Sequence, residues 1–189
     1  MSNKKPMVLV IAGPNGSGKS TISEYFDKVG EYTNADEYVV STGVSNEEAA
    51  KIVDKKRYEA IENREDFSFE TVLSSHYKLD ILREAKKNGY FIKCIFVLTS
   101  DPMINIARVQ TRVAAGGHDV ECNKILDRYE KSLANISDLL NICDIMHVYD
   151  NSTQKPERII RKHKSDISIM PNPRWNSERI IKLISGATN

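Results

Sequence analysis

The residues with the clearest chemical potential form a glycine-rich segment near the start of the chain. Gly13, four further residues and then Gly18-Lys19-Ser20 match the pattern G-x-x-x-x-G-K-[ST]. The segment follows the apolar run "MVLVIA" and precedes a stretch that favours a helix. Glycines let backbone amides turn inward around phosphate oxygens, and the helix N-terminus adds partial positive charge. The spacing therefore predicts a loop that binds the phosphates of a nucleotide.

The side chains of this loop have separate expected roles. Lys19 would reach the β- and γ-phosphates, and the Ser20 hydroxyl would hold Mg²⁺. If the chain is a kinase, ATP and Mg²⁺ are the expected cofactors. The predicted nucleotide-binding residues are Gly13, Pro14, Asn15, Gly16, Ser17, Gly18, Lys19, Ser20 and Thr21.

The loop alone is shared by several classes of nucleotide enzyme. GTPases usually contain a base-reading motif N-K-x-D, and "NKIL" at residues 123–126 does not match it. Large ATPases carry an aspartate at the end of a neighbouring strand, whereas the third expected strand here ends in Glu70-Thr71. At this chain length the remaining large class is the small-molecule and nucleotide kinases.

Carboxylates at two expected strand ends are candidates for the acceptor half of a kinase site. A kinase needs a carboxylate that takes the proton of the acceptor hydroxyl while facing the γ-phosphate. Asp36 and Glu37 follow a weak strand expected over residues 32–35, and Glu70 lies near the end of one expected over residues 67–72. Asp36 also fits a turn or helix cap, and Glu70 also fits a solvent-facing edge position.

Three arginines flank a pair of glycines and could neutralise the phosphate in transfer. Arg108 and Arg112 are four residues apart and share one helix face, while Arg128 lies on the next expected helix. Between them, Gly116-Gly117-His118 has the character of a hinge, so the two helices would form a lid. A solvated basic face would explain any single arginine, and His118 is either a phosphate donor or a turn residue. The candidate catalytic residues are Asp36, Lys19, Arg108, Arg112, Arg128 and His118.

Strands and helices are expected to alternate along the chain, which is typical of a parallel sheet with sites at the carboxyl ends of its strands. The expected strands cover residues 7–12, 32–35, 67–72, 90–100 and 144–151, and the expected helices cover residues 19–28, 46–63, 77–88, 102–116 and 121–141. This predicts an α/β fold of three layers, the P-loop NTPase or kinase fold, with a mainly parallel five-stranded sheet and a helical lid. Residues beyond 152 should add two helices and a short edge element.

Composition bounds the other functions that the chain could have. Its 189 residues favour one domain, with a motif-bearing core at residues 7–152 and a C-terminal extension at 153–189. The 27 basic and 26 acidic residues nearly balance, so neither nucleic acid nor a membrane surface is an expected partner. Three cysteines without metal-ligand spacing, and no signal peptide or apolar span, favour the cytoplasm.

Together these segments resemble the zeta toxin family of P-loop kinases, especially its short members. The similar pieces occur in family order: "GPNGSGKST" (13–21), "TNADE" (33–37), "FSFETVLS" (67–74), "RVQTRVAAGGHDV" (108–120) and "VYDNS" (148–152). The loop is common to many families, whereas "FETVLS" and "GGHDV" are specific.

The resemblance implies an acceptor and roles for single residues. Studied members of the family phosphorylate the 3′-hydroxyl of the N-acetylglucosamine unit in UDP-N-acetylglucosamine, a UDP-sugar. By similarity Asp36 is the general base, Lys19 grips phosphate, Glu70 contacts substrate and Arg108 is the first lid arginine. The second lid arginine has no clean counterpart, so His118 or Arg128 would replace it. The resemblance also implies a small helical antitoxin as partner. The substrate-binding residues would be Asn34, Asp36, Glu70 and Thr71.

Two alternatives remain open at the level of sequence. One is a kinase of another hydroxyl, carried by a nucleoside, a sugar or a nucleic-acid end. The other is a regulatory module that binds ATP without turnover. Acceptor-dependent release of ADP separates both from a kinase of UDP-N-acetylglucosamine.

Overall fold

The apolar run before the glycine-rich loop forms the central strand of the sheet. The structure is a computed structural model that describes residues 4–117 and 119–186. In it β1 (Met7–Ala12) is buried along nearly its whole length. β1 pairs in parallel with β3 (Phe67–Thr71) on one side and with β4 (Phe91–Leu98) on the other. A continuous apolar run is the expected sequence of a strand buried on both faces.

The remaining strands extend this sheet on both sides. They are β2 (Glu31–Thr33), β5 (Ile145–Asp150), β6 (Glu157–His163) and β7 (Asp166–Ile169). The seven strands have the order β2-β3-β1-β4-β5-β6-β7, in which the first five are parallel and the last two antiparallel. The expected α/β fold with a mainly parallel sheet is confirmed. The expected number of five strands is wrong, because the sheet formed by the described residues has seven strands.

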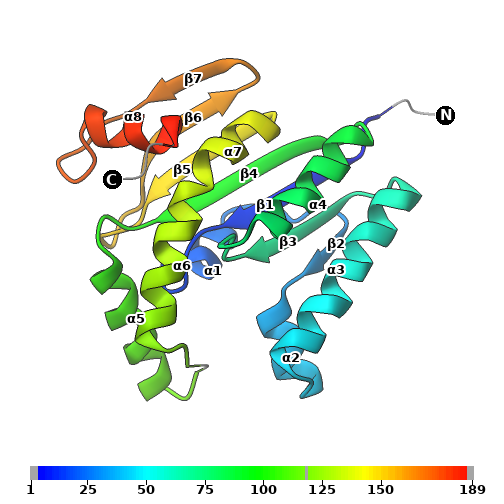
Figure 1. Cartoon of the computed structure of the whole chain (residues 1–189), viewed down its shortest axis with the longest axis horizontal. Helices are drawn as coiled ribbons and strands as arrows, with labels where there is room; N and C mark the ends of the chain where they lie inside the picture. Colours follow the sequence, from blue (N-terminus) through cyan, green and yellow to red (C-terminus); the bar gives the residue numbers. More distant parts are fainter. Residues whose placement is uncertain (1–3, 118, 187–189) are drawn as a thin grey trace.

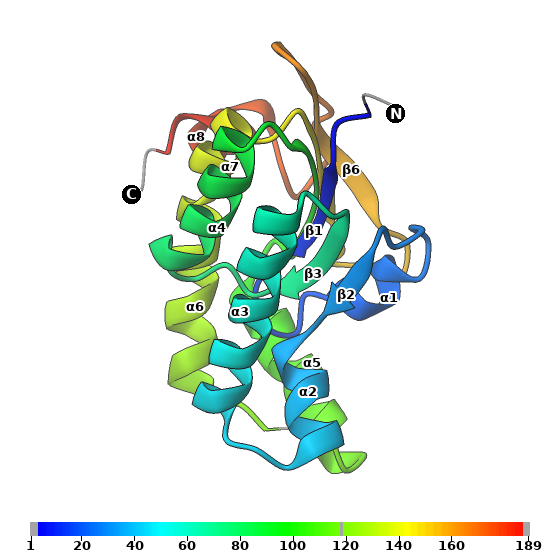
Figure 2. The ribbon, with the colours of Figure 1, turned by 90° about the vertical axis from the view of Figure 1, so that its right-hand side faces the viewer.

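Helices cover the two faces of the sheet unequally (Figures 1 and 2). Among the described residues, one face carries only α1 (Lys19–Ser23) and a small core that includes Leu9, Ile11 and Ile22. The larger core lies between the opposite face and the other helices of the layer. These helices are α3 (Asn46–Asn63), α4 (His76–Lys87), α6 (Cys122–Ala134), α7 (Ile136–Ile142) and α8 (Ser177–Ser185).

Two helices stand beyond the end of the sheet where the site lies (Figure 1). α2 (Ala35–Thr42) follows β2, and α5 (Pro102–Ala114) follows β4. Asp101 caps α5 by accepting a hydrogen bond from the backbone N–H of Met103 at 2.8 Å, as its sequence predicts. α5 packs on α6 through a small separate cluster of Ile106, Val109 and Ile125. This helical hairpin corresponds to the predicted lid.

Two predicted helices differ from the observed ones. α1 ends at Ser23, not near residue 28. The helix expected over residues 121–141 is two helices, α6 and α7, which meet at Asn135. The side-chain amide of Asn135 donates to the backbone carbonyl of Leu73 at 2.8 Å. This tertiary contact stabilises the break between α6 and α7, although the apolar pattern of the sequence continues from one helix to the other.

The C-terminal segment also differs from its prediction. Instead of two helices and a short edge element it forms the antiparallel strands β6 and β7 and one helix, α8. Trp175 is fully buried in the larger core and anchors this segment by packing. Arg174 pairs with the buried Asp150 at 2.7 Å and so ties the segment to the end of β5.

Two further observations concern the described residues as a whole. No helix within residues 4–117 and 119–186 is both long and apolar enough to cross a membrane. The cysteines Cys94, Cys122 and Cys143 are free thiols, and the first and last of them are buried. Cys94 and Cys143 therefore contribute to the packing of the core, whereas Cys122 is exposed.

Candidate active site

The glycine-rich loop packs so tightly that its three glycines have no room for a side chain. A Cβ atom on Gly13 would lie 2.0 Å from the backbone oxygen of Val97. A Cβ atom on Gly16 would lie 2.4 Å from the backbone oxygen of Asn105, and one on Gly18 would lie 2.3 Å from the amide nitrogen of Asn151. Gly16 and Gly18 also have positive φ, 74° and 88°. The loop conformation that the motif predicts thus depends on glycine at these positions.

Two asparagines outside the motif hold the loop, one from α5 and one from the end of β5. Asn105, in the first turns of α5, is fully buried and donates to the backbone oxygen of Asn15 at 2.6 Å. Asn151, directly after β5, donates to the backbone oxygen of Ser17 at 2.8 Å. The strand expected over residues 144–151 ends at this asparagine. Asn105 was missed, and its only sequence signal is a polar residue on the apolar face of α5.

Lys19 is buried at the centre of the site. Its Nζ donates to the backbone oxygen of Pro14 at 3.2 Å and lies 3.9 Å from Oε1 of Glu70. Burial lowers the pKa of Lys19, and the negative charges of Glu70 and Asp36 oppose that change. The lysine therefore points over the loop in a pocket where an anion would stabilise its charge.

Glu70 faces Lys19 from the end of β3. Its carboxylate accepts hydrogen bonds from Ser20 Oγ at 3.5 Å and from the Tyr32 hydroxyl at 3.4 Å. Burial raises the pKa of Glu70, whereas the positive charge of Lys19 opposes the rise. The solvent-facing alternative for Glu70 is wrong, because only 10% of its side chain is exposed.

Asp36 lies in the first turn of α2, so the prediction that it ends a strand is wrong. β2 stops at Thr33, and Asn34 caps α2 by accepting a hydrogen bond from the backbone N–H of Asp36 at 3.1 Å. Glu37 lies in the same turn. The cap of α2 is therefore Asn34, and not Asp36 as the sequence also allowed. The Asp36 side chain instead lines the cavities described next.

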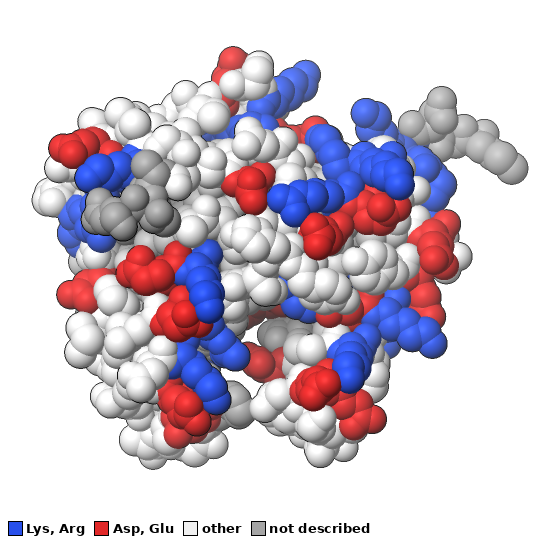
Figure 3. Space-filling model, viewed as in Figure 1, with Lys and Arg blue, Asp and Glu red and all other residues white. Residues whose placement is uncertain are grey.

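Two cavities meet beside Lys19. One has a volume of about 480 Å³ and extends toward α3, α4 and the start of α6. The other has a volume of about 550 Å³ and lies over the loop between α2 and α5. The surface is hollowed between these helices, with acidic and basic side chains around the opening (Figure 3). The residues that line both cavities are Asn15, Lys19, Asn34, Asp36 and Glu70.

The lid arginines divide between the two cavities. Arg108 and Arg112 line the loop cavity, and Arg108 Nη1 lies 3.5 Å from the backbone oxygen of Ser17. Arg128 lines the other cavity, where its Nη1 donates to Oδ1 of Asn15 at 3.3 Å. All three thus converge on the loop, as expected, whereas His118 lies outside the described residues.

The other predicted residues fall close to the loop. Gly16, Gly18, Ser20 and Thr21 line the loop cavity, and Thr71 lines the other one. Gly13, Pro14 and Ser17 line neither of these two cavities. They shape the loop instead, since the backbone N–H of Gly13 donates to Thr71 at 3.2 Å and the carbonyl oxygens of Pro14 and Ser17 accept the bonds given above.

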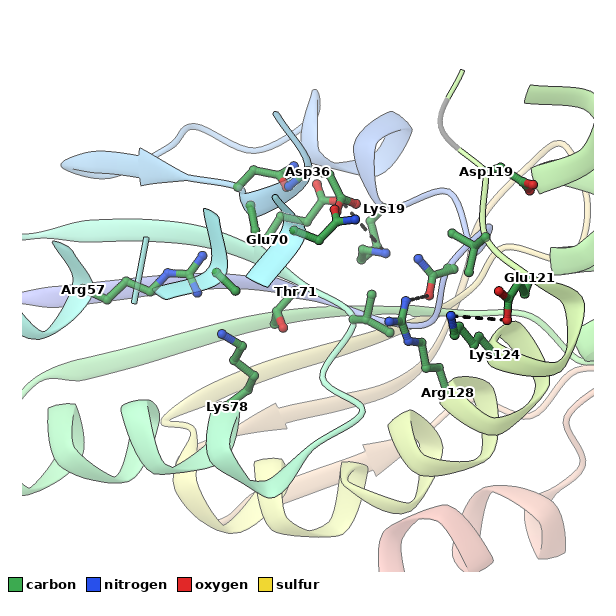
Figure 4. Close-up of a pocket in the computed structure, with 17 residues that line it drawn as sticks. Lys19, Asp36, Arg57, Glu70, Thr71, Lys78, Asp119, Glu121, Lys124 and Arg128 are labelled. Carbon is green, nitrogen blue, oxygen red and sulfur yellow. Dashed lines mark hydrogen bonds and ion pairs between the residues drawn. The ribbon is translucent and has the colours of Figure 1, made fainter. Parts of the chain in front are cut away.

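Cations that the sequence did not single out also line the first cavity. Arg57 of α3 and Lys78 of α4 lie on one side of it, and Lys124 of α6 lies on the lid side (Figure 4). Arg57 follows Asp54 by three residues on the buried face of α3. In the sequence, Asp54 and Arg57 are a charged pair at positions on the apolar face of the helix, and this pair could have indicated a role for Arg57. Lys78 and Lys124 lie among polar neighbours and have no such signal.

Comparisons with known proteins agree with the motif and the fold. A model of the zeta toxin family matches residues 31–163, more than half of the chain. The match begins beyond Thr21, so it is independent of the loop motif. An uncharacterized protein of Haemophilus influenzae is 28% identical over 135 residues, which cover 68% of this chain and 94% of that protein.

Solved structures with the same fold include two described as complexes or systems of paired proteins. A crystal structure of AvrRxo1-ORF1 and ORF2 with ATP has a TM-score of 0.74 at 13% identity, and the match covers 99% of this chain and 66% of that chain. A structure of the PezAT toxin–antitoxin system of Streptococcus pneumoniae has a TM-score of 0.62 at 13% identity and covers 100% and 82%. At these identities the likeness shows the fold alone. Taken with the family match and the loop motif, it means that the chain belongs to the zeta toxin family and is a P-loop kinase.

Proposed function

We propose that the chain transfers the γ-phosphate of ATP to a hydroxyl group of UDP-N-acetylglucosamine. The observation that carries the proposal is the meeting of two cavities at Lys19, Asp36 and Glu70. A kinase must bind a phosphate donor and an acceptor on opposite sides of one transfer point. The loop cavity would hold the donor phosphates, and the cavity toward α3 and α4 would hold the acceptor.

The donor side is supported by the loop and by a structural neighbour. The loop turns its backbone toward the cavity at the N-terminus of α1, where anions are stabilised. A chain of the AvrRxo1-ORF1:-ORF2 complex has this fold, and that complex was crystallised with ATP. We therefore propose ATP as the donor, with Lys19 reaching its terminal phosphates.

The oxygen groups beside the loop fit a magnesium ion. Mg²⁺ is usually held by one or two carboxylates, waters and substrate phosphates, not by a cage of protein ligands. Ser20 Oγ and Glu70 Oε1 lie 3.5 Å apart and face the same space. Within the described residues no cluster of three or more His, Cys, Asp or Glu is suited to a metal. Ser20 would hold the ion, which neutralises charge on the β- and γ-phosphates when bound.

The proposed transfer uses the side chains around the meeting point. Asp36 would accept the proton of the acceptor hydroxyl as its oxygen bonds to the γ-phosphorus and the bond to the β-phosphate oxygen breaks. Lys19, Arg108, Arg112 and Arg128 would stabilise the negative charge on the migrating group. Their approach from both the loop and the lid supports these roles.

The acceptor proposal rests on family membership and is supported by the charge of the first cavity. Basic side chains from three of its walls, Arg57, Lys78 and Arg128, would favour an acceptor with an anionic group. UDP-N-acetylglucosamine carries a diphosphate as well as sugar hydroxyls. The test is mass spectrometry of this compound after incubation with enzyme, ATP and Mg²⁺. A product with one added phosphate supports the proposal, and unchanged substrate at high enzyme concentration overturns this choice of acceptor.

We also propose a small helical antitoxin as a partner. The likeness to the PezAT toxin–antitoxin system and to the AvrRxo1 complex supports it. Induced expression of the chain should then arrest bacterial growth, and expression together with the antitoxin should restore it. Unimpaired growth at a confirmed level of active protein would contradict the proposal.

Replacing Gly16 by alanine should weaken ATP binding at least about tenfold. The new Cβ would lie 2.4 Å from the backbone oxygen of Asn105, so the loop must shift. Gly43→Ala is the matched control, because Gly43 also has a φ of 74° but no atom within 4 Å of the new Cβ. Calorimetric titration with ATP measures both variants. Equal affinities for the two would show that the tight packing of Gly16 is irrelevant to the nucleotide.

Replacing Arg128 by alanine should lower the rate of transfer at least about tenfold, with a smaller effect on ATP affinity. Arg128 reaches Asn15 from the lid and would contact the phosphate mainly during transfer. Lys131→Ala is the control, since Lys131 is an exposed cation of the same helix, paired with Asp127 at 2.8 Å. If Arg128→Ala changes only ATP affinity, Arg128 is a binding residue and does not complete the lid.

A further inference from the structure

A buried carboxylate on α3 holds two cations at the edge of the first cavity. Asp54 is 4% exposed. Its Oδ1 accepts a hydrogen bond from Arg57 Nη1 at 2.8 Å, and Lys78 Nζ lies 2.7 Å from Oδ1 and 2.5 Å from Oδ2. Arg57 and Lys78 line the cavity, whereas Asp54 lies behind them. The carboxylate thus fixes a pair of cations from two helices at one place.

This end of the cavity has an excess of positive charge. Two cations share one carboxylate, so the cluster of Asp54, Arg57 and Lys78 carries a formal charge of +1. The acidic residues that line the cavity belong to other walls, at the transfer point or on the lid side (Figure 4). They are Asp36, Glu70, Asp119 and Glu121. An anion would therefore be attracted to the side formed by α3 and α4.

The cluster also has donors left for a ligand. Of the five N–H groups of Arg57, one reaches Asp54 and two reach the hydroxyl and carbonyl oxygens of Thr33, at 2.9 and 3.2 Å. Arg57 also stacks on the ring of Phe69, with 4.3 Å between its Cζ and the ring centroid. Lys78 directs two of its three N–H groups at Asp54. The described hydrogen bonds leave two N–H groups of Arg57 and one of Lys78 uncommitted.

We infer that Arg57 and Lys78 form an anion-binding subsite for a phosphate group of the acceptor, and that Asp54 is the positioning residue that fixes them. As an acceptor subsite it rests on the proposed function. Binding there would orient the acceptor, with its phosphate toward α3 and α4 and its hydroxyl toward Asp36 and Lys19. The subsite would thereby select acceptors that carry a phosphate over neutral sugars.

If the cluster of Asp54, Arg57 and Lys78 had only a structural role, substitution of Lys78 would have a different effect on anion binding. Arg57 holds Thr33 at the end of β2, and Asp36 follows three residues later, so loss of Arg57 could also displace Asp36. Lys78 makes none of the described bonds to β2 and extends from the first turns of α4 to Asp54. Substitution of Lys78 therefore tests the subsite without disturbing the support of Asp36.

The first test measures binding of inorganic pyrophosphate while the loop is saturated with a non-hydrolysable ATP analogue and Mg²⁺. Lys78→Met should weaken pyrophosphate binding about tenfold, the usual effect of one charge-assisted hydrogen bond. Lys86→Met is the matched control, because Lys86 lies on the same helix and pairs with Asp144 at 2.6 Å. It should bind like the wild type. Absence of binding to the wild type, or equal binding to Lys78→Met, overturns the subsite.

The second test separates acceptor binding from chemistry. With UDP-N-acetylglucosamine, Lys78→Met should raise the KM for the acceptor about tenfold, with the KM for ATP unchanged. Lys78→Arg should recover part of the loss, since it restores the charge. Asp54→Asn should also raise the acceptor KM, although its melting temperature should fall, because the variant leaves Arg57 and Lys78 without their buried carboxylate. Equal changes for ATP and acceptor contradict the assignment. A wild type that binds pyrophosphate through Lys78 but phosphorylates nothing refutes the kinase proposal and leaves the anion site standing.

Discussion

Replacing Asp36 by asparagine is expected to lower phosphoryl transfer at least about 10²-fold while ATP affinity stays unchanged. Asparagine keeps the shape of the side chain but cannot accept a proton from the acceptor hydroxyl. Asp36 lines both cavities and acts electrostatically on Lys19 and Glu70, which places its charge at their meeting point. Steady-state turnover and calorimetric ATP binding, measured on the same preparation, check the prediction.

The neighbouring carboxylate is the control for this variant. Glu37 lies in the same first turn of α2 but lines only the loop cavity. It accepts a hydrogen bond from the Asn34 side chain at 3.1 Å. Glu37→Gln removes one negative charge from the same turn and should retain most of the turnover. If Asp36→Asn and Glu37→Gln lose activity equally, the local charge matters and Asp36 is not the base.

Replacing Lys19 by alanine should weaken ATP binding and slow transfer together, with a loss of at least about 10²-fold in kcat/KM. The ammonium group is the buried cation of the loop, 9% exposed at its side chain. It would contact the phosphates both before and during transfer, so its removal affects ground-state binding and the transition state. Comparison of kcat, KM for ATP and the direct dissociation constant measures both contributions.

A change in folding must be separated from this loss, because Lys19 also faces Glu70. Burial raises the pKa of Glu70, and the positive charge of Lys19 opposes this rise. Lys19→Ala removes that opposing interaction. The double variant Lys19→Ala, Glu70→Gln removes the unpaired carboxylate and should restore stability without restoring transfer. Lys56→Ala, at an exposed lysine paired with Glu31 at 2.7 Å, should leave activity unchanged. Recovery of transfer in the double variant would contradict the assigned role of Lys19.

Local patterns predicted the elements that carry strong periodic or continuous apolar signals. β1 and α3 have the expected boundaries, because a buried run and a capped amphipathic stretch specify them locally. α2 was missed because none of its residues is buried, and it therefore has no apolar stripe. β6 and β7 depend on pairing with β5, which a local pattern does not reveal.

The candidate site shows the same division between local and long-range information. The loop and its strand-end partners follow from a motif and from the rule that sites lie at the carboxyl ends of parallel strands. Arg57 and Lys78, in contrast, are brought together by packing of α3 against α4 around Asp54. Neither helix alone contains this arrangement. The roles assigned to the single site residues stay predictions until the variants are measured.

The fate of the γ-phosphate tests the central claim most directly. The enzyme is incubated with Mg²⁺, UDP-N-acetylglucosamine and ATP labelled at the γ-phosphate, and the label is followed into organic and inorganic products. A kinase that joins donor and acceptor between the two cavities should move the label into the nucleotide sugar and release ADP only when the acceptor is present. Label that stays in ATP, or appears only as inorganic phosphate, would contradict the account.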